Sequence, residues 1–211
     1  MIAKALHRTI ETVPRRWILV AAAILAIGSA IAVSGYGSPT FADLSSPVQG
    51  VLAIVVPFTG VLAADSRYPV GRTLAAASVV GAGAGVFGAA VCAMAAATSP
   101  ALFVWHGAAL VVAGSVLVQV VAQWVGTGLG FLIRHRLTAC LASVVLPLAL
   151  WFVLGVIHPP LQPWLTPYPS VRHLLSGSMS AAEWAQCGVV AVLWGIGLSA
   201  AGAGRATASQ A

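Results

Sequence analysis

The sequence predicts an all-α membrane protein whose chain crosses the bilayer six times. Of its 211 residues, 60% are hydrophobic and only 7% are Asp, Glu, Lys or Arg, and the mean hydropathy is +0.99. A soluble domain carries about 25% charged residues, so lipid must be the main solvent of this chain. The apolar residues also fall into runs of the length that a helical span needs, about 20 residues. The whole chain, 1–211, is therefore expected to form a single transmembrane domain.

Six apolar runs are separated by short polar or proline-rich stretches. The expected spans lie near 17–35, 48–64, 74–97, 103–133, 138–157 and 184–203. The fourth run is longer than a perpendicular crossing requires at 1.5 Å per residue, so it must tilt or protrude. Pro57 and Pro147 fall inside the second and fifth spans and should kink them.

The segment before the first span, residues 2–14, has the pattern of a short amphipathic helix. Ile2, Leu6 and Ile10 fall on one helical face, while Lys4 and Arg8 lie largely on the other. This pattern suits a helix on the membrane surface, although an ordinary polar flank of the first span explains it equally well. The segment is too long and too polar for a cleavable signal sequence.

The basic residues indicate the orientation of the chain. Lys and Arg accumulate in short cytoplasmic loops, and six spans with the N-terminus inside place nine of the ten Lys and Arg on that side. These nine are Lys4, Arg8, Arg15, Arg16, Arg67, Arg72, Arg134, Arg136 and Arg205. Only Arg172 falls outside. Both termini are thus expected to be cytoplasmic, and the net charge of +6 is explained by topology rather than by a nucleic-acid partner.

No catalytic or metal-binding pattern is present in the sequence. The acidic residues alternate between the two sides of the predicted membrane, so no carboxylate pair forms, and the five His and three Cys lack ligand spacing. There is no GxxxxGK[ST] loop for ATP and no GxSxG nucleophile motif. The sequence therefore predicts no catalytic residue, no metal and no cofactor bound by this chain.

Gln119 and Gln123 are the strongest polar residues inside a predicted span, and they share one face of the fourth span. They could line a substrate path or form hydrogen bonds between helices. No Asp, Glu, Lys or Arg lies inside a predicted span, which argues against a carrier coupled to protons or sodium. Gly81 and Gly85 form a GxxxG pattern that permits close helix packing, either within the chain or in a dimer.

Two loops carry the remaining candidate sites. The cytoplasmic loop between the second and third spans holds Asp65, Ser66, Arg67, Tyr68 and Arg72, and it is either a solvated turn or a contact surface. The long outer segment 158–183 is proline-rich and contains Trp164, Tyr168 and Arg172. It is either an outer gate in a hairpin or a loop that rests on the membrane surface.

This layout resembles the half-size permease of an ABC exporter of the ABC-2 type. The resemblance covers nearly the whole chain and rests on layout: the surface helix at 2–14, six spans, the loop 64–73 and the outer segment 158–183. The C-terminal part is also similar in its order of polar and apolar segments, from WLTPYPSVRHLL through Glu183-Trp184 to VVAVLWGIGLSAAG and Arg205. It departs from the family at the coupling loop, where Asp65 and Gly71-Arg72-Thr73 match only loosely a Glu followed by Gly-Thr.

The resemblance implies a function and a set of partners. Two copies of the chain, or the chain and a sister permease, would pair around a pathway in a bacterial cytoplasmic membrane. Separate ATPase subunits, which bind ATP and Mg²⁺, would dock on the loop that contains Asp65, Ser66, Arg67, Tyr68 and Arg72. The exported substrate would be amphipathic or hydrophobic, such as a drug, lipid, peptide or glycan.

Two other classes of function stay open at the level of the sequence. The chain could be a membrane anchor or scaffold subunit that does not transport, or a secondary carrier or channel. The lack of charge within the spans and of an alignable inverted repeat argues against the carrier. A neighbouring gene for an ATPase with a Walker A motif would favour the exporter over both.

Overall fold

The structure, a computed structural model that describes residues 13–64 and 69–208, has six helical segments long and apolar enough to cross a membrane. They are α2 (Val13–Ser34), α3 (Phe41–Val55) with α4 (Pro57–Ala63), α5 (Val70–Ala96), α6 (Ala108–Leu132), α7 (Arg136–Ile157), and α10 (Ala181–Val190) with the π-helix η2 (Ala191–Gly197) and α11 (Leu198–Ala208). The described part of the chain contains no strand. The expected all-α class with six apolar spans is confirmed. Residues 2–12 of the expected surface helix lie outside the described residues.

The second span begins seven residues earlier than expected, at Phe41 instead of 48. Thr40 caps it: its hydroxyl accepts from the backbone N–H of Asp43, and the Asp43 carboxylate accepts from the backbone N–H of Thr40 at 2.9 Å. Such a reciprocal cap satisfies two otherwise free N–H groups. The polar stretch before 48 therefore belongs to the helix, and Asp43 lies in its first turn. The predicted break at Pro57 is present, since α3 ends at Val55 and α4 begins at Pro57.

The fourth and sixth spans also differ at their ends from the sequence prediction. The fourth begins at Ala108 instead of 103, because Gly107 adopts a left-handed conformation with φ 67° that precedes the helix. The sixth begins at Ala181 instead of 184, where Ser180 and Glu183 form a second reciprocal cap. The third and fifth spans extend the expected ranges by a few residues toward their N-termini, at Val70 and Arg136.

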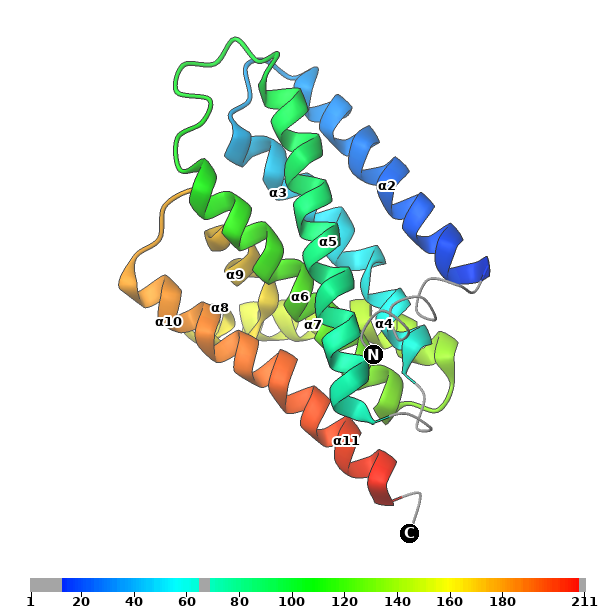
Figure 1. The fold of residues 1–211 in the computed structure, drawn as a ribbon. Coiled ribbons are helices and arrows are strands. Elements are labelled where there is room, and N and C mark those ends of the chain that lie inside the picture. The colour runs from blue at the N-terminus through cyan, green and yellow to red at the C-terminus, as the bar shows by residue number, and fades with distance from the viewer. Residues whose placement is uncertain (1–12, 65–68, 209–211) are drawn as a thin grey trace.

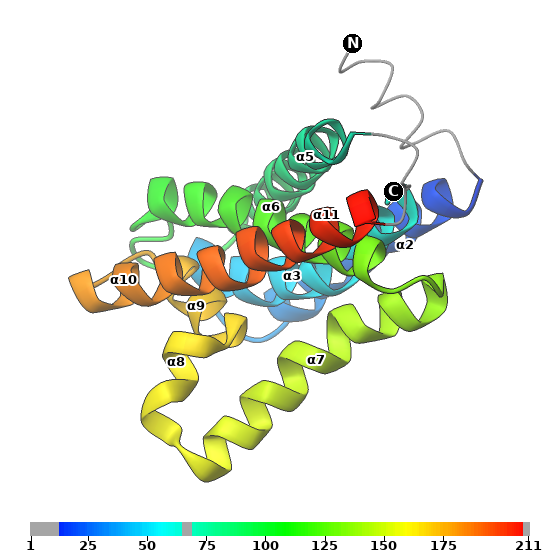
Figure 2. The same cartoon turned by 90° about the horizontal axis from the view of Figure 1, so that it is seen from below.

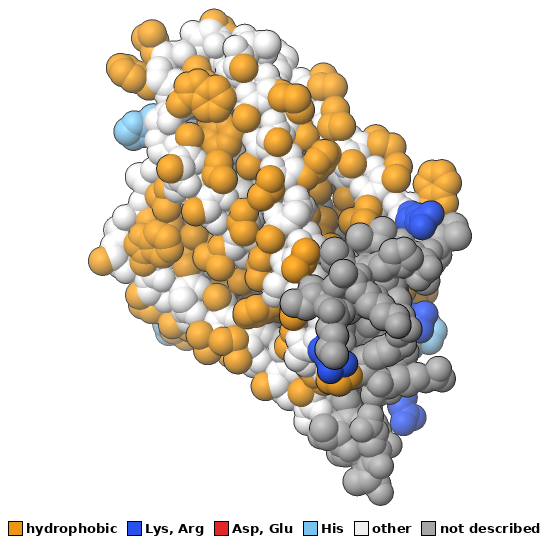
Figure 3. Space-filling model, in the orientation of Figure 1, with side chains coloured by type: hydrophobic (Ala, Val, Ile, Leu, Met, Phe, Trp, Pro, Cys, Tyr) orange, Lys and Arg blue, Asp and Glu red, His pale blue; other side chains and the backbone are white. Residues whose placement is uncertain are grey.

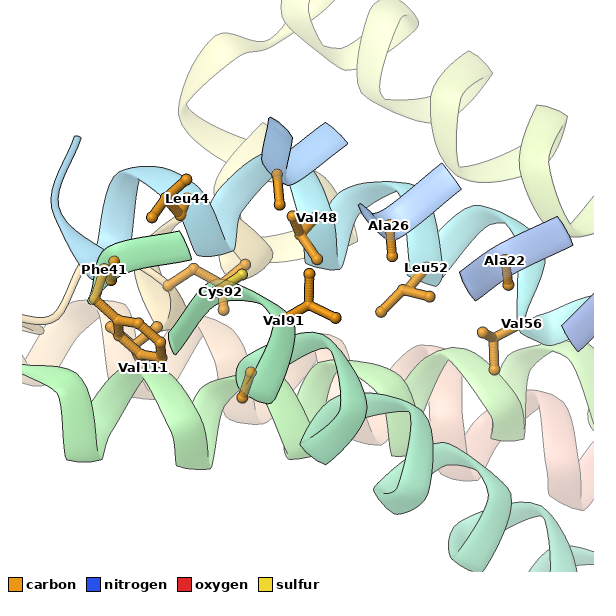
Figure 4. Close-up of a cluster of buried hydrophobic side chains, with 14 residues drawn as sticks. Ala22, Ala26, Phe41, Leu44, Val48, Leu52, Val56, Val91, Cys92 and Val111 are labelled. Carbon is orange, nitrogen blue, oxygen red and sulfur yellow. The ribbon is translucent and has the colours of Figure 1, made fainter. Parts of the chain in front are cut away.

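The main packed core lies between α2, α3, α5 and α6. Figure 4 shows side chains from all four helices converging there, including Ala26, Leu52, Val91 and Val111. The fully buried residues from α2 are alanines, which allow that helix to approach α3 closely. Because lipid removes the hydrophobic drive between spans, close packing of this kind is a main source of cohesion in a bilayer.

Glycine brings α5 against α6 along much of their length. A Cβ at Gly81 would lie 2.7 Å from the carbonyl oxygen of Gln119, and one at Gly85 would lie 2.7 Å from that of Ser115. These distances are too short for real Cβ contacts, and the obstructing atoms are backbone. The GxxxG pattern is thus used for packing within the chain.

Arginines from separate parts of the sequence gather at one end of the bundle, which we call the arginine end: Arg15, Arg16, Arg72, Arg134, Arg136 and Arg205. Helices α2, α5 and α7 begin at this end, and α11 ends there (Figure 1). Arg15 donates to the carbonyl of Leu62, and Arg205 donates to that of Leu132 at 2.8 Å. Figure 3 shows the basic side chains of this face confined to the same end.

Helix α7 stands apart from the rest of the bundle. It leaves α6 at the arginine end and diverges from α3 and α6 toward the opposite end (Figure 2). Ala139, near its start, is its only buried residue, although the helix is the most hydropathic of the six spans. The chain then returns to the bundle through three short helices, η1 (Pro159–Leu161), α8 (Gln162–Leu165) and α9 (Pro167–Leu174).

Candidate functional site

A cavity of about 600 Å³ lies between α7 and the bundle. Its walls come from α3, α4, α6, α7, α9, α10 and η2, and most of the lining side chains are aliphatic or proline. The size falls in the range of pockets that enclose a small organic ligand. Among the residues that the structure describes, Arg172 is the only Lys, Arg, Asp or Glu in the walls.

The divergence of α7 creates this space, and prolines shape its walls. Pro47, Pro57, Pro147 and Pro167 all line the cavity. A proline inside a helix has no N–H, so the carbonyl four residues earlier loses its helical partner. For Pro147 that carbonyl belongs to Ser143, which is also a lining residue. The α7 part of the cavity wall therefore contains a serine as well as aliphatic surface.

The short helix α9 lines the cavity at the end opposite the arginine end, and α8 precedes it in the chain without contributing to the wall. Helix α9 is inserted into the bundle, since the Leu174 carbonyl lies against Gly114, about two turns inside α6. On the α7 side, the Gln162 side chain donates to the Trp151 carbonyl at 2.8 Å, and the rings of Trp151 and Tyr168 lie 5.2 Å apart. The outer segment is thus a packed part of the bundle, rather than a loop over its end.

On the opposite side, α9 is fixed to the last span. The imidazole of His173 lies 2.6 Å from the carboxylate of Glu183, which also caps α10. Trp194, in the π-helix η2, lines the cavity and donates from its indole N–H to the Leu165 carbonyl at 2.7 Å. A π-helix is rare and is found often at functional sites. Here it places Trp194 where one side chain forms both a wall and a link to α8.

The three residues of the expected outer gate are only partly brought together. Tyr168 and Arg172 line the cavity, whereas Trp164 does not. The structure adds Trp194 and Ser170, which sequence reasoning missed. The sequence carries no signal for Trp194, because the π-helix changes which residues share a face.

Gln119 and Gln123 are completely buried and do not line the cavity. Gln119 donates at 2.9 Å to both the backbone and the side-chain carbonyl of Gln49, whose own amide donates to the Gly85 carbonyl at 3.1 Å. Gln123 donates to the Val56 carbonyl at 3.0 Å and to the Thr59 hydroxyl at 2.7 Å. Their geometry is therefore that of hydrogen bonds between helices, with Gln49 as a partner that the sequence analysis did not single out.

We expect replacement of Gln123 by Leu to destabilise the folded chain by about 0.6 to 2 kcal/mol, the usual range for hydrogen bonds between spans. The change keeps the side-chain size and removes both bonds to the break between α3 and α4. The thermal unfolding midpoint in detergent measures it, with Gln186→Leu on half-buried Gln186 as the control. Unchanged stability together with lost transport would instead favour a role in the substrate path.

Most of the expected coupling site cannot be placed, because Asp65, Ser66, Arg67 and Tyr68 lie outside the described residues. Arg72 is described, and it is exposed in the first turn of α5. A cation at a helix N-terminus is unfavourable by about 0.3 to 1 kcal/mol. Arginines also lie in the first turns of α2 and α7, where the helix dipole is equally unfavourable. Helix stability therefore does not explain the position of these arginines, whereas an external anionic surface would.

No metal centre is formed by the residues that the structure describes, since no three of their His, Cys, Asp and Glu side chains come together. The described cysteines, Cys92, Cys140 and Cys187, are free thiols. No protein-family model matches the chain. No curated protein matches it either. The cavity and the arginine end are thus the two features of the described chain that point to a function.

Proposed function

We propose that the chain is the membrane-spanning permease subunit of an ATP-driven exporter of the ABC-2 type. It moves an amphipathic or hydrophobic substrate, of the drug, lipid, peptide or glycan kind, out of the cell. The observation that carries the proposal is the cavity between α7 and the bundle, which is mainly apolar, large enough for a ligand and lined at one end by α9. An anchor or scaffold subunit has no need of such a cavity.

The chemistry of the cavity supports an external source of energy. Carriers driven by proton or sodium gradients usually place an acidic group at the site to bind the coupling cation. Within the described residues, no carboxylate lines this cavity. In the proposal, ATP and Mg²⁺ are bound by a separate ATPase subunit, and this chain is not itself an enzyme.

The arginine end is the proposed docking face for the ATPase and lies on the cytoplasmic side of a bacterial cytoplasmic membrane, with both termini inside. Support comes from the positive-inside rule and from the attraction of basic residues to anionic lipid headgroups on that face. Arg72 would contact the ATPase together with the neighbouring residues Asp65 to Tyr68. Two permease chains, identical or sister, pair around the pathway in this scheme.

Charge reversal at the docking loop tests this function. We expect Arg72→Glu, alone and with Arg67→Glu, to weaken co-purification of the ATPase and to lower transport-linked ATP hydrolysis, because a repulsive contact replaces an attractive one. Complex yield and ATPase rate in proteoliposomes measure the effect. The matched control is Arg172→Glu, which makes the same charge change at the other end of the chain and should leave assembly intact.

Two results would contradict the proposal. If no ATPase with a Walker A motif co-purifies with the unmodified chain from its native membrane, the scaffold or carrier interpretation gains. If the ATPase binds but reversal of both arginines changes neither assembly nor hydrolysis, the docking face lies elsewhere.

A further inference from the structure

Arg172 is an exposed cation in the wall of a mainly apolar cavity, and no carboxylate of the described chain pairs with it. The described carboxylates are engaged elsewhere: Asp43 caps α3 with Thr40, and Glu183 caps α10 and pairs with His173. Arg172 lies in the last turn of α9, where a cation suits the helix dipole. That accounts for its position on the helix, but not for its place in the cavity wall.

A second observation points to a polar ligand group on the same short helix. The hydroxyl of Ser170 is buried, with the residue 4% exposed, and it has no hydrogen-bond partner among the described residues. Ser170 also lines the cavity. A buried hydroxyl without a partner is costly, by about 1 to 3 kcal/mol. The Oγ atom itself has almost no accessible surface, so a ligand oxygen reaches it only if a neighbouring side chain moves aside.

The rest of the cavity selects for an apolar body. Between α3, α6 and α7 the walls are formed mainly by side chains such as Val51, Ile54, Leu117, Val121 and Leu148. These surfaces offer a ligand few polar contacts at a distance from α9. The charge thus lies at the α9 end of the cavity, while the polar side chains of α3 and α7 in its walls, Ser46 and Ser143, are uncharged.

Topology gives independent support for a functional role of Arg172. Every other described arginine lies at the arginine end, where the positive-inside rule explains it. Arg172 lies at the opposite end, against that bias. A basic residue on the disfavoured side, which belongs to a cavity wall and is also exposed at the surface, is suited to bind an anionic ligand.

We infer that the cavity binds an amphiphile with one anionic head group, phosphate or carboxylate, held by Arg172 near Ser170, and an apolar chain between α3, α6 and α7. This inference rests on the proposed function only in naming the substrate class of the exporter. The binding itself requires no ATPase. The head group can belong to a membrane lipid or to a single-chain amphiphile, since the chemistry of recognition is the same.

Binding to the purified full chain in phosphatidylcholine nanodiscs tests the inference without the ATPase. Radiolabelled dodecyl phosphate is the probe, and dodecanol is the neutral ligand of equal chain length. We expect the phosphate to bind about tenfold or more tightly than the alcohol, as one charge-assisted contact provides. Arg172→Gln should remove this preference and leave dodecanol binding unchanged, while Arg172→Lys should keep part of it.

The control is Arg134→Gln, which removes an exposed cation at the arginine end and should leave the preference intact. Equal affinity of the two ligands for the unmodified chain, or a preference that survives Arg172→Gln, would overturn the inference. The first criterion needs no variant, so it holds even if Arg172→Gln does not fold. Competition by added phosphatidylglycerol would identify a lipid as the anionic ligand; its absence would identify a single-chain amphiphile.

The binding result and the transport result are separable. If dodecyl phosphate binds through Arg172 but no ATPase assembles with the chain, the site is real and the exporter proposal fails. If the ATPase assembles and the binding preference is absent, the exporter proposal stands and the anionic substrate class is wrong.

Discussion

Replacement of Gly85 by Leu should strongly destabilise the fold, so that most of the expressed protein does not fold. A Cβ at this position would lie 2.7 Å from the Ser115 carbonyl oxygen and 2.7 Å from the Val116 Cα, so α5 and α6 would have to separate. Overpacking in a core usually costs about 1 to 3 kcal/mol. The cost here should reach the upper end of that range or exceed it, because the obstructing atoms are backbone and cannot change rotamer.

The yield of monodisperse protein in mild detergent and its thermal unfolding midpoint measure this effect. Gly83→Leu is the matched control, since Gly83 is exposed on the same helix and a Cβ there meets nothing within 4 Å. The control should fold like the unmodified chain. If Gly85→Leu gave a well-folded monomer and lost only a dimer, the GxxxG pattern would be a seam between chains, and the packing of α5 on α6 described above would be wrong.

Replacement of Gly50 by Trp should abolish export while leaving the chain folded. Gly50 lines the cavity, and a Cβ there meets nothing within 4 Å. The indole would therefore extend from α3 into open space and occupy volume that a substrate needs. Tryptophan has the largest of the natural side chains, so it would fill a substantial part of a cavity of about 600 Å³.

ATP-dependent efflux of a fluorescent amphiphile from proteoliposomes, with the partner ATPase present, measures the loss. Gly28→Trp provides the control, because Gly28 is exposed on α2, outside the cavity, with nothing within 4 Å of its Cβ. Both variants should keep the unmodified thermal midpoint within a few degrees. Undiminished efflux by a folded Gly50→Trp variant would show that the substrate does not pass through this cavity.

Much of the fold could be predicted from the sequence because a bilayer imposes simple rules. Each span needs about 20 apolar residues, and the six runs were found on that basis. Errors occurred where helices extend into polar sequence. The start of the second span at Phe41 was missed because its first turn contains Asp43, and a carboxylate there is explained only by the cap with Thr40.

The candidate site was much harder to predict. Gln119 and Gln123 were rightly identified as adjacent polar groups on one face, but the two open roles could not be separated without knowing which helix faces them. The structure brings Gln49, Val56 and Thr59 to that face. For Tyr168 and Arg172, the sequence indicated an amphiphilic outer segment, and their shared cavity depends on how α9 inserts beside α6.

By itself, the sequence determined the solvent of this protein, the number of its apolar spans and the uneven distribution of its arginines. These properties depend on composition and on spacing along the chain, because each segment partitions between lipid and water according to its own residues. Only the tertiary structure decided that α7 diverges from the bundle, that a π-helix turns Trp194 toward the resulting space and that Arg172 faces an apolar cavity. Those features arise from contacts between segments far apart in sequence. Neither hydropathy nor helical periodicity can predict these features. Both describe how polar or apolar the surroundings of a helix are, and neither identifies the particular helix that packs beside it.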